Sequence, residues 1–281
     1  MRRNLNPLPY CLAVACAANV GSAATLIGNP QNMLIGQSLQ MNFAGYLLEA
    51  IVPAVVGCAI VWAIIAWMSR GDWHRTFTIP PVEASPFNAW QSGKGVAVVA
   101  CVMAAFLFTN WSHAIVALAA AGVLLMSRKM ASQKMLGLVD WHLLVLFVGL
   151  FVVNHAFAAT GMLDAAAASM REAGVDPAEP GWLFAISAVL SNLVSNVPAV
   201  MLLLPFAEHP LAGPVLAISS TLAGNLIIVG SIANIIVIDQ AARLNIRIDW
   251  RQHARIGVPV TLTTLAFAAV WLWWRMTMMM G

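Results

Sequence analysis

The sequence predicts an all-α polytopic membrane protein with about seven crossings and one re-entrant hairpin. Of its 281 residues, 61% are hydrophobic and only 9% are charged, and the mean hydropathy is +0.83. Soluble domains average roughly 45–50% apolar and about 25% charged residues. So few charged side chains could not cover the core of a soluble fold of this length. The composition therefore excludes a cytosolic enzyme, a disordered regulator and a nucleic-acid binder.

Apolar runs of helical length define the segments that cross or enter the bilayer, because ~20 helical residues span its hydrocarbon core. In chain order they are 8–40, 43–68, 93–109, 112–126, 141–160, 182–206, 214–240 and 255–274. Between the second and third of these, 69–92 is polar and contains Pro80, Pro81 and Pro86, which prevent a continuous helix. We expect that segment to be a cytoplasmic linker.

Basic residues predict the orientation, because cytoplasmic loops are enriched in Lys and Arg. If the N-terminus is cytoplasmic and 182–206 enters and leaves on the same side, 12 of the 14 basic residues are cytoplasmic. Only Arg171 and Arg275 then lie outside. A full crossing by 182–206 would place the basic cluster at 243–255 outside. The charge pattern therefore predicts a multi-pass membrane protein with a cytoplasmic N-terminus, in which 182–206 is a re-entrant hairpin.

Three of the apolar segments are interrupted by Gly, Pro, Ser and Asn. The interruptions are expected at 28–32, at 191–198, and at 224–225 with 230–234. Backbone that leaves a helix inside a membrane has no lipid partner for its polar groups, so it must be buried in protein or line a cavity. The interrupted segments are therefore the candidate binding region.

Two of the interruptions resemble each other. Gly28-x-x-x-Asn32-Met-Leu-Ile recurs as Gly230-x-x-x-Asn234-Ile-Ile-Val, 202 residues later. In the predicted topology the two segments cross in opposite directions, which is typical of inverted-repeat transporters. We expect 1–68 to end a first repeat and 93–281 to form the second, although small and polar residues also serve helix packing alone.

The chemistry of a broken helix indicates its ligands. A half-helix that starts at mid-membrane directs free N–H groups and a positive dipole end at an anion. The end of the other half offers carbonyl oxygens, which suit Na⁺ together with Asn and Ser oxygens. None of the 11 acidic residues lies at the breaks, whereas proton-driven carriers usually keep an ionisable group within the membrane. This favours sodium coupling or simple anion passage.

The three motifs resemble the ion transporter superfamily. They read ANVGSAATLIGNPQN at 18–32, SNVP at 195–198 and GNLIIVGSIAN at 224–234. The chain is most similar to the bacterial anion permease branch, which is related to divalent-anion/sodium symporters, citrate carriers and arsenite pumps. The resemblance covers essentially the whole chain. It implies that the hairpin tip and the unwound loops together bind sodium and a substrate carboxylate.

By position, Ser195 and Asn196 match the first two residues of the symporters' Ser-Asn-Thr tip, and Val197 replaces the threonine. Gly28 and Gly230 begin the two unwound loops. The substrate- and ion-binding residues that follow are Thr25, Gly28, Asn29, Pro30, Asn32, Ser195, Asn196, Val197, Pro198, Asn225, Gly230, Ser231 and Asn234. Sodium is expected at Ser195, Asn196, Gly230 and Asn234. Other branches carry Asp before this Asn, so Ser195 argues against a sodium/proton antiporter.

These observations predict a secondary transporter of a small anion or oxyanion, carboxylates included, coupled to a cation. The expected partners are the lipid bilayer, the small anion, and a second copy in a homodimer or a missing N-terminal half; sodium is the one expected cofactor. The resemblance implies a hairpin before the first broken helix, so the chain reads as N-terminally truncated. A partner-dependent or non-functional fragment, an arsenite efflux permease and an antiporter-type permease remain alternatives. An intramembrane enzyme is disfavoured because the sequence has no His-Glu-x-x-His and no aspartate pair.

Overall fold

A computed structural model describes residues 2–3, 5–73, 77–78, 88–109, 111–126, 137, 139 and 141–280. Its contacts divide the chain into two units. The larger unit comprises Met1–Met41, Gly45–Pro81 and Asn154–Gly281, and the smaller unit comprises Asn42–Ala44 and Val82–Val153. The two units are described separately below.

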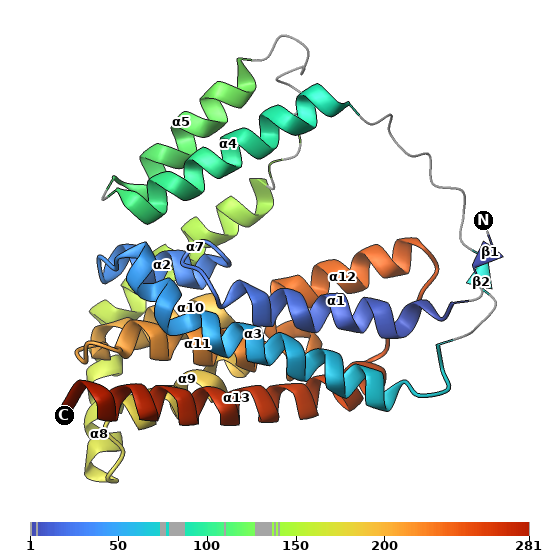
Figure 1. Cartoon of the computed structure of the whole chain (residues 1–281). Coiled ribbons are helices and arrows are strands. Elements are labelled where there is room, and N and C mark those ends of the chain that lie inside the picture. Colours follow the sequence, from blue (N-terminus) through green and yellow to red (C-terminus); the bar gives the residue numbers. More distant parts are fainter. Residues whose placement is uncertain are drawn as a thin grey trace. The chain divides into compact units, whose positions relative to one another are not determined.

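The larger unit is helical, apart from a two-stranded antiparallel ribbon of β1 (Arg2–Arg3) and β2 (Phe77–Thr78). Its helices are α1 (Pro7–Ser22), α2 (Pro30–Ser38), α3 (Phe43–Met68), α8 (Met162–Glu172), α9 (Pro180–Val194), α10 (Asn196–Leu203), α11 (Ala212–Ala223), α12 (Ile232–Arg243) and α13 (Trp250–Met280), with two 3₁₀ turns, η1 (Leu204–Phe206) and η2 (Ile228–Gly230). Every residue of α11 is buried. This helix therefore forms the core of the unit, against which α9, α10, α2 and α13 pack (Figure 1).

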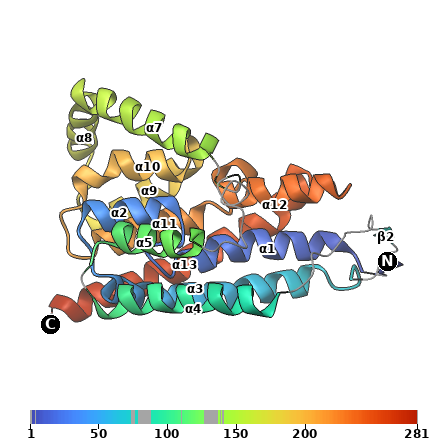
Figure 2. The same cartoon turned by 90° about the horizontal axis from the view of Figure 1, so that it is seen from above.

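The helices of this unit run in two opposed directions. In Figure 1, α1 and α13 run from right to left, whereas α3 and α12 run from left to right. The view from above in Figure 2 shows the same arrangement. The broken segment α1–α2 and the broken segment α11–α12 thus cross the unit in opposite senses.

The smaller unit contains α4 (Ala89–Phe108), α5 (His113–Leu125) and most of α7 (Trp141–Ala159). Helices α4 and α5 lie side by side. Where the chain turns between them, the rings of Phe43, Phe106 and His113 pack with centroids 4.7–5.8 Å apart. No residue of α5 is buried within the described part of the chain, although its sequence is apolar, as suits a surface that faces lipid.

The structure corrects the positions of the breaks. The first predicted interruption, 28–32, overlaps α2, which begins at Pro30 because Asn29 caps it and proline fits the first helical turn. The third overlaps α12, which Ser231 caps in the same way. In the hairpin, the predicted interruption 191–198 contracts to Ser195 alone, between α9 and α10. The Asn and Pro residues therefore start helices rather than extend the loops.

Two other boundaries also differ from the sequence prediction. Helix α4 begins at Ala89, inside the predicted linker 69–92, and most of that linker lies outside the described residues. The predicted outer loop 161–181 contains α8. After α8, Asp176 accepts hydrogen bonds from the Ala178 amide and the Arg171 guanidinium, and these bonds hold the pKa of Asp176 below its ordinary value.

The described helices support a multi-pass membrane protein. Three of them are long and apolar enough to span a bilayer, namely Phe43–Met68, Ala89–Phe108 and Trp250–Met279. A fourth span exists if Leu144–Ala159 and Met162–Glu172, bent by 64°, count as one. The broken segments consist of shorter helices and fail this length test individually. The count of seven crossings therefore stays a prediction.

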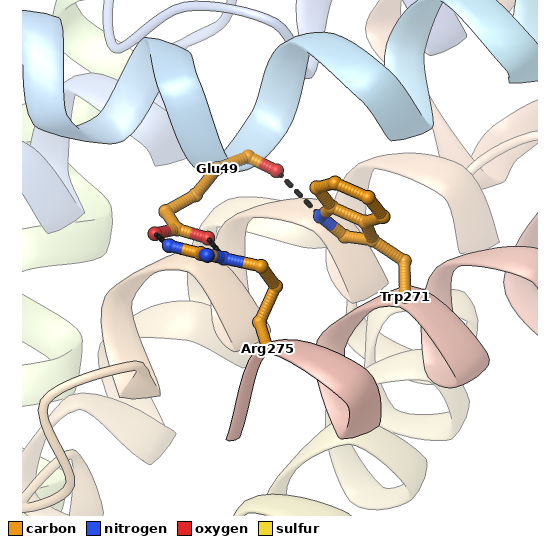
Figure 3. Close-up of polar contacts among 3 residues, drawn as sticks. All are labelled: Glu49, Trp271 and Arg275. Carbon is orange, nitrogen blue, oxygen red and sulfur yellow. Dashed lines mark hydrogen bonds and ion pairs between the residues drawn. The ribbon is translucent and has the colours of Figure 1, made fainter. Parts of the chain in front are cut away.

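A polar contact joins two of the long helices, α3 and α13. Glu49 and Arg275 form a doubly hydrogen-bonded ion pair, and the indole Nε1 of Trp271 donates to the Glu49 carbonyl oxygen at 2.9 Å (Figure 3). In an α-helix that carbonyl would accept from the residue four positions later, which here is Pro53. Proline has no N–H, so Trp271 supplies the donor that α3 lacks.

Candidate site at the two broken helices

At the first break, amide side chains hold the interrupted backbone. The Asn29 side chain caps α2 by accepting from the Asn32 amide N–H at 2.8 Å. The Asn32 side-chain amide, fully buried, donates to the carbonyl oxygens of Ser22 and Thr25 at 3.3 and 3.1 Å. The Tyr46 hydroxyl donates to the Ala23 carbonyl at 2.7 Å. The carbonyl groups at and after the end of α1, which have no N–H partner within the helix, therefore accept hydrogen bonds from side chains.

The second break is held in the same manner. The Ser231 hydroxyl caps α12 by accepting from the Ala233 amide at 3.2 Å. The buried Asn234 side chain donates to the carbonyl oxygens of Gly224 and Ile227 at 2.9 and 3.4 Å. The His253 Nε2 lies 3.0 Å from the Asn225 carbonyl oxygen.

These two sets of hydrogen bonds correspond residue by residue at the offset of 202 that the Gly-x-x-x-Asn motif shows. The corresponding pairs are Ser22 and Gly224, Ala23 and Asn225, Thr25 and Ile227, Asn29 and Ser231, and Asn32 and Asn234. Several of the pairs differ in residue type but share the same backbone role. The correspondence therefore lies in geometry that a comparison of residue letters detects only in part.

The glycines of the motif permit close approach of the backbone. A Cβ atom on Gly28 would lie 1.9 Å from the Ser22 carbonyl oxygen, so no other residue fits there without a shift. A Cβ on Gly230 would lie 3.0 Å from Oδ1 of Asn192, in α9. The first glycine is required by its own loop, and the second leaves room for a polar atom of the hairpin.

The hairpin tip carries an unusual backbone conformation. Ser195 has φ 75° and ψ 159°, a region that is essentially reserved for glycine, and its side chain does not cap α10. The next residue, Asn196, is buried. In the amide orientation that satisfies both of its ends, it donates to the carbonyl oxygens of Gly230 and Ser220 and accepts from Gln31 Nε2, each at 3.1 Å. The tip thus touches both broken segments.

The structure brings most of the sequence-predicted residues together. Asn196, Asn225, Gly230, Ser231 and Asn234 surround the second break, while Asn29 and Asn32 lie at the first. Thr25 is bonded through its backbone carbonyl, Gly28 is exposed, and Pro30 and Pro198 occupy first turns of helices. Val197 is buried as an apolar residue in α10.

The sequence reasoning missed Asn19, Gln31 and Thr221 as members of the cluster. Asn19 donates to the side-chain oxygens of Asn225 and Asn234 at 2.8 and 3.0 Å. Thr221 accepts from Asn29 Nδ2 at 3.0 Å and from Gln31 Nε2 at 3.3 Å. Asn19 and Thr221 are themselves 202 residues apart. That spacing is the signal by which the sequence could have identified them.

Buried oxygens without a hydrogen-bond partner lie on one side of α9. Within the described part of the chain they include the hydroxyls of Ser187 and Ser191 and Oδ1 of Asn192. Unpartnered buried oxygens are costly, and a bound cation or water would satisfy them. The last of the three lies 3.0 Å from where a Cβ of Gly230 would be, so Asn192 places an unpartnered oxygen at the second break.

Among the residues named above, the polar cluster contains no Asp, Glu, Lys or Arg side chain, and His253 is its one histidine. Its positive potential comes from the starts of α2, α10 and α12, where backbone N–H groups lie at the breaks. Amide groups act both as donors and as acceptors. The arrangement therefore offers N–H groups of the kind that suit an anion and oxygens of the kind that suit a cation.

The chain matches known transporters over nearly its full length. The family described as citrate transporter (CitMHS) matches residues 1–216. An uncharacterized transporter of Mycobacterium bovis, Mb2703, is 28% identical over 98% of the chain and 69% of its own length. The inner membrane protein YbiR of Escherichia coli is 31% identical over 88% of the chain and 62% of its own length. The silicon efflux transporter LSI3 of Oryza sativa subsp. japonica is 27% identical over 94% and 70%.

The family match covers well over half of the chain, and it agrees with the broken apolar helices and with the absence of an enzyme motif in the sequence. A multi-pass membrane transporter, rather than an enzyme, is what these relatives and this fold have in common. The chain belongs to the citrate transporter family, within the ion transporter superfamily that its motifs resemble.

Proposed function

We propose that this protein is a cation-coupled secondary transporter of a small anion or oxyanion, in the inner membrane with a cytoplasmic N-terminus. The observation that carries the proposal is the pair of broken segments. Their hydrogen bonds correspond at one fixed offset along the sequence, and the two segments run in opposite directions. Opposed broken helices that meet at mid-molecule are the usual site of substrate and ion in inverted-repeat transporters. The family's printed description, citrate transporter, supports a carboxylate as the first substrate to test.

In this proposal the Ser195 hydroxyl at the hairpin tip and the backbone N–H groups at the helix starts together bind the anion. Val197 N–H at the start of α10 has no capping side chain to bond it, and the chain enters this helix through the strained residue Ser195. The cation binds at the oxygens of Ser191, Asn192, Asn196 and Asn234 and at the carbonyl of Gly230. Sodium fits this set better than a proton does, because none of these groups is a carboxylate.

The test is uptake into proteoliposomes that contain the purified full chain. We expect labelled citrate to accumulate under an inward Na⁺ gradient and not under a pH gradient in Na⁺-free buffer. Asn196→Leu and Asn234→Leu should each weaken uptake or binding roughly 5- to 150-fold, because each strands buried partner groups. Asn154→Leu, a polar-to-apolar change in α7, is the control and should have a milder effect.

Three outcomes would redirect the proposal. Uptake that proton gradients drive equally well without Na⁺ would contradict sodium coupling. Parental binding by both Asn196→Leu and Asn234→Leu would mean that the breaks are packing features only. Activity that appears only after co-expression with an upstream polypeptide would indicate the partner-dependent alternative.

A second candidate substrate is an uncharged oxyacid. The cluster has no basic side chain among its named members, and one relative carries the name silicon efflux transporter. Counterflow of labelled citrate against unlabelled arsenite or silicic acid separates the two candidates. Competition by the uncharged species alone would favour the second one.

A further inference from the structure

One side chain reaches from each broken segment into the other. Asn19, in the last turn of α1, accepts from the Ser231 hydroxyl that caps α12 and donates to Asn234 Oδ1 at 3.0 Å. Thr221, in the last turn of α11, accepts from Nδ2 of Asn29, the residue that caps α2, at 3.0 Å, and its hydroxyl lies 3.4 Å from Asn32 Oδ1. Both residues are almost fully buried, at 4% and 1% exposure.

The two exchanges correspond to each other. Asn19 and Thr221 occupy positions 202 apart, as do their capping partners Asn29 and Ser231. In each case, a residue in the last turn of the helix before one break bonds the residue that caps the helix after the other break. Asn19 of α1 bonds Ser231, which caps α12, and Thr221 of α11 bonds Asn29, which caps α2. Neither contact is needed to close a helix locally, because each capping side chain already bonds its own helix.

Neighbouring hydroxyls in α11 behave differently. Ser219 and Ser220 are fully buried, yet their hydroxyls donate to carbonyl oxygens of α11 itself, at 2.7 and 2.6 Å. Such bonds within a helix are the usual fate of a buried serine in an apolar helix. The outward bonds of Thr221 are therefore specific to its position and do not follow from burial.

We infer that Asn19 and Thr221 are positioning residues, each of which holds the start of the second half-helix in the opposite broken segment. The inference rests on the proposed function in so far as these helix starts bind the ligands. It adds that the two breaks are coupled. A ligand that fixes α12 acts through Asn19 on α1, and one that fixes α2 acts through Thr221 on α11.

Hydrogen exchange of the full chain in lipid nanodiscs tests this crossed arrangement directly. Thr221→Val keeps the side-chain shape and removes its hydrogen bonds, and Asn19→Val removes the side-chain hydrogen bonds of Asn19. We expect Thr221→Val to speed exchange of the amides at 32–36 roughly tenfold, and Asn19→Val to speed exchange at 233–238 to a similar extent. Ser219→Ala, in the same helix as Thr221, should change neither region.

The conservative variants Thr221→Ser, which retains the hydroxyl, and Asn19→Gln, which retains the side-chain amide, should keep exchange slow. If the valine variants do not fold, a double-mutant cycle between Thr221→Ala and Asn29→Ala measures the coupling between the two segments, and additive effects would contradict the positioning role. The inference is overturned if each valine variant loosens only its own segment, or loosens the opposite one no more than Ser219→Ala does.

The two proposals fail in distinguishable ways. Uptake that lacks any response to Na⁺ or citrate contradicts the proposed function and leaves the exchange pattern intact. Normal Na⁺-driven uptake with no crossed exchange effect contradicts the positioning role alone. If both hold, Thr221→Val should raise the Na⁺ concentration for half-maximal uptake several-fold and lower the apparent cooperativity for Na⁺, as Thr221→Ser should not.

Discussion

Ser195 is the residue at which backbone conformation and proposed ligand chemistry meet. A side chain at φ 75° and ψ 159° lies in a region that costs of order 1–3 kcal/mol for residues other than glycine. Such strain persists only where surrounding contacts fix it. Here they do: the flanking helices pack against each other, and Asn196 is bonded to both broken segments.

Replacing Ser195 separates the strain from the hydroxyl. Ser195→Gly should raise the free energy of unfolding by about 1 kcal/mol relative to Ser195→Ala, because only glycine relaxes at positive φ. Both variants lose the hydroxyl and should lose anion binding alike. Thermal unfolding in detergent measures the first difference, and citrate binding measures the second.

The control for that comparison is Ala166→Gly, in the exposed middle of α8, where glycine should destabilise by about 1 kcal/mol. Equal stability of Ser195→Gly and Ser195→Ala would mean that the tip is unstrained. Retained binding in either variant would assign the anion site to backbone groups rather than to the hydroxyl.

At the same scale, the sequence predicted which polar residues lie at the breaks better than it predicted their hydrogen-bond partners. Asn32 and Asn234 stand out because amides are rare in apolar segments, and both lie at the breaks. Their side-chain N–H groups, however, bond carbonyls of their own loops. A buried amide can bind a ligand or donate to a backbone carbonyl, and the distances that decide between the two do not follow from spacing along the chain. Thr221 was not predicted for the same reason.

At the scale of elements, α3 depends on a donor from another helix. Pro53 leaves the Glu49 carbonyl without a partner from α3 itself, and Trp271 of α13 fills that position (Figure 3). An unpaired carbonyl in lipid is strongly unfavourable, because the bilayer core contains no water to bond it. The indole and the proline should therefore be energetically coupled.

A double-mutant cycle measures that coupling. Trp271→Phe should lower the free energy of unfolding by about 1–3 kcal/mol in the parent, and by clearly less when Pro53→Ala supplies a backbone N–H. Trp273→Phe, an exposed indole on the same helix, is the control. Additive effects of Trp271→Phe and Pro53→Ala in chemical denaturation would contradict the assignment.

The helix boundaries show which features of the fold the residue pattern alone can predict. The end of α3 falls where the sequence predicts, because a long apolar run stops at polar residues. The starts of α2 and α12 do not, because the same Asn, Ser and Pro residues that suggest a loop also cap a helix. Helix α8 was missed because its polar face, with Asp164, Arg171 and Glu172, resembles an exposed loop.

At the scale of the whole molecule, the ion pair on α3 and α13 bears on the orientation that the basic residues predict. Arg275 is one of two basic residues that the charge pattern leaves outside, and it is paired with Glu49. Pairing neutralises it, so it weighs little in the bias that orients the chain. The 182–206 hairpin, now seen as α9 and α10 joined at Ser195, determines on which side the cluster at 243–255 lies.

Cysteine labelling in intact cells tests that topology. In a background where Cys11, Cys16, Cys58 and Cys101 are alanine, Ala173→Cys and Ala242→Cys place single thiols at two exposed positions on opposite sides of the hairpin. We expect a membrane-impermeant maleimide to label Ala173→Cys in whole cells and Ala242→Cys only after the cells are opened. Ala242→Cys is expected inside because the neighbouring segment holds four arginines, and positive residues are retained in the cytoplasm. Labelling of both thiols from the same side would mean that α9 and α10 cross the membrane between them, and the opposed arrangement of the two broken segments relative to the bilayer would then be wrong.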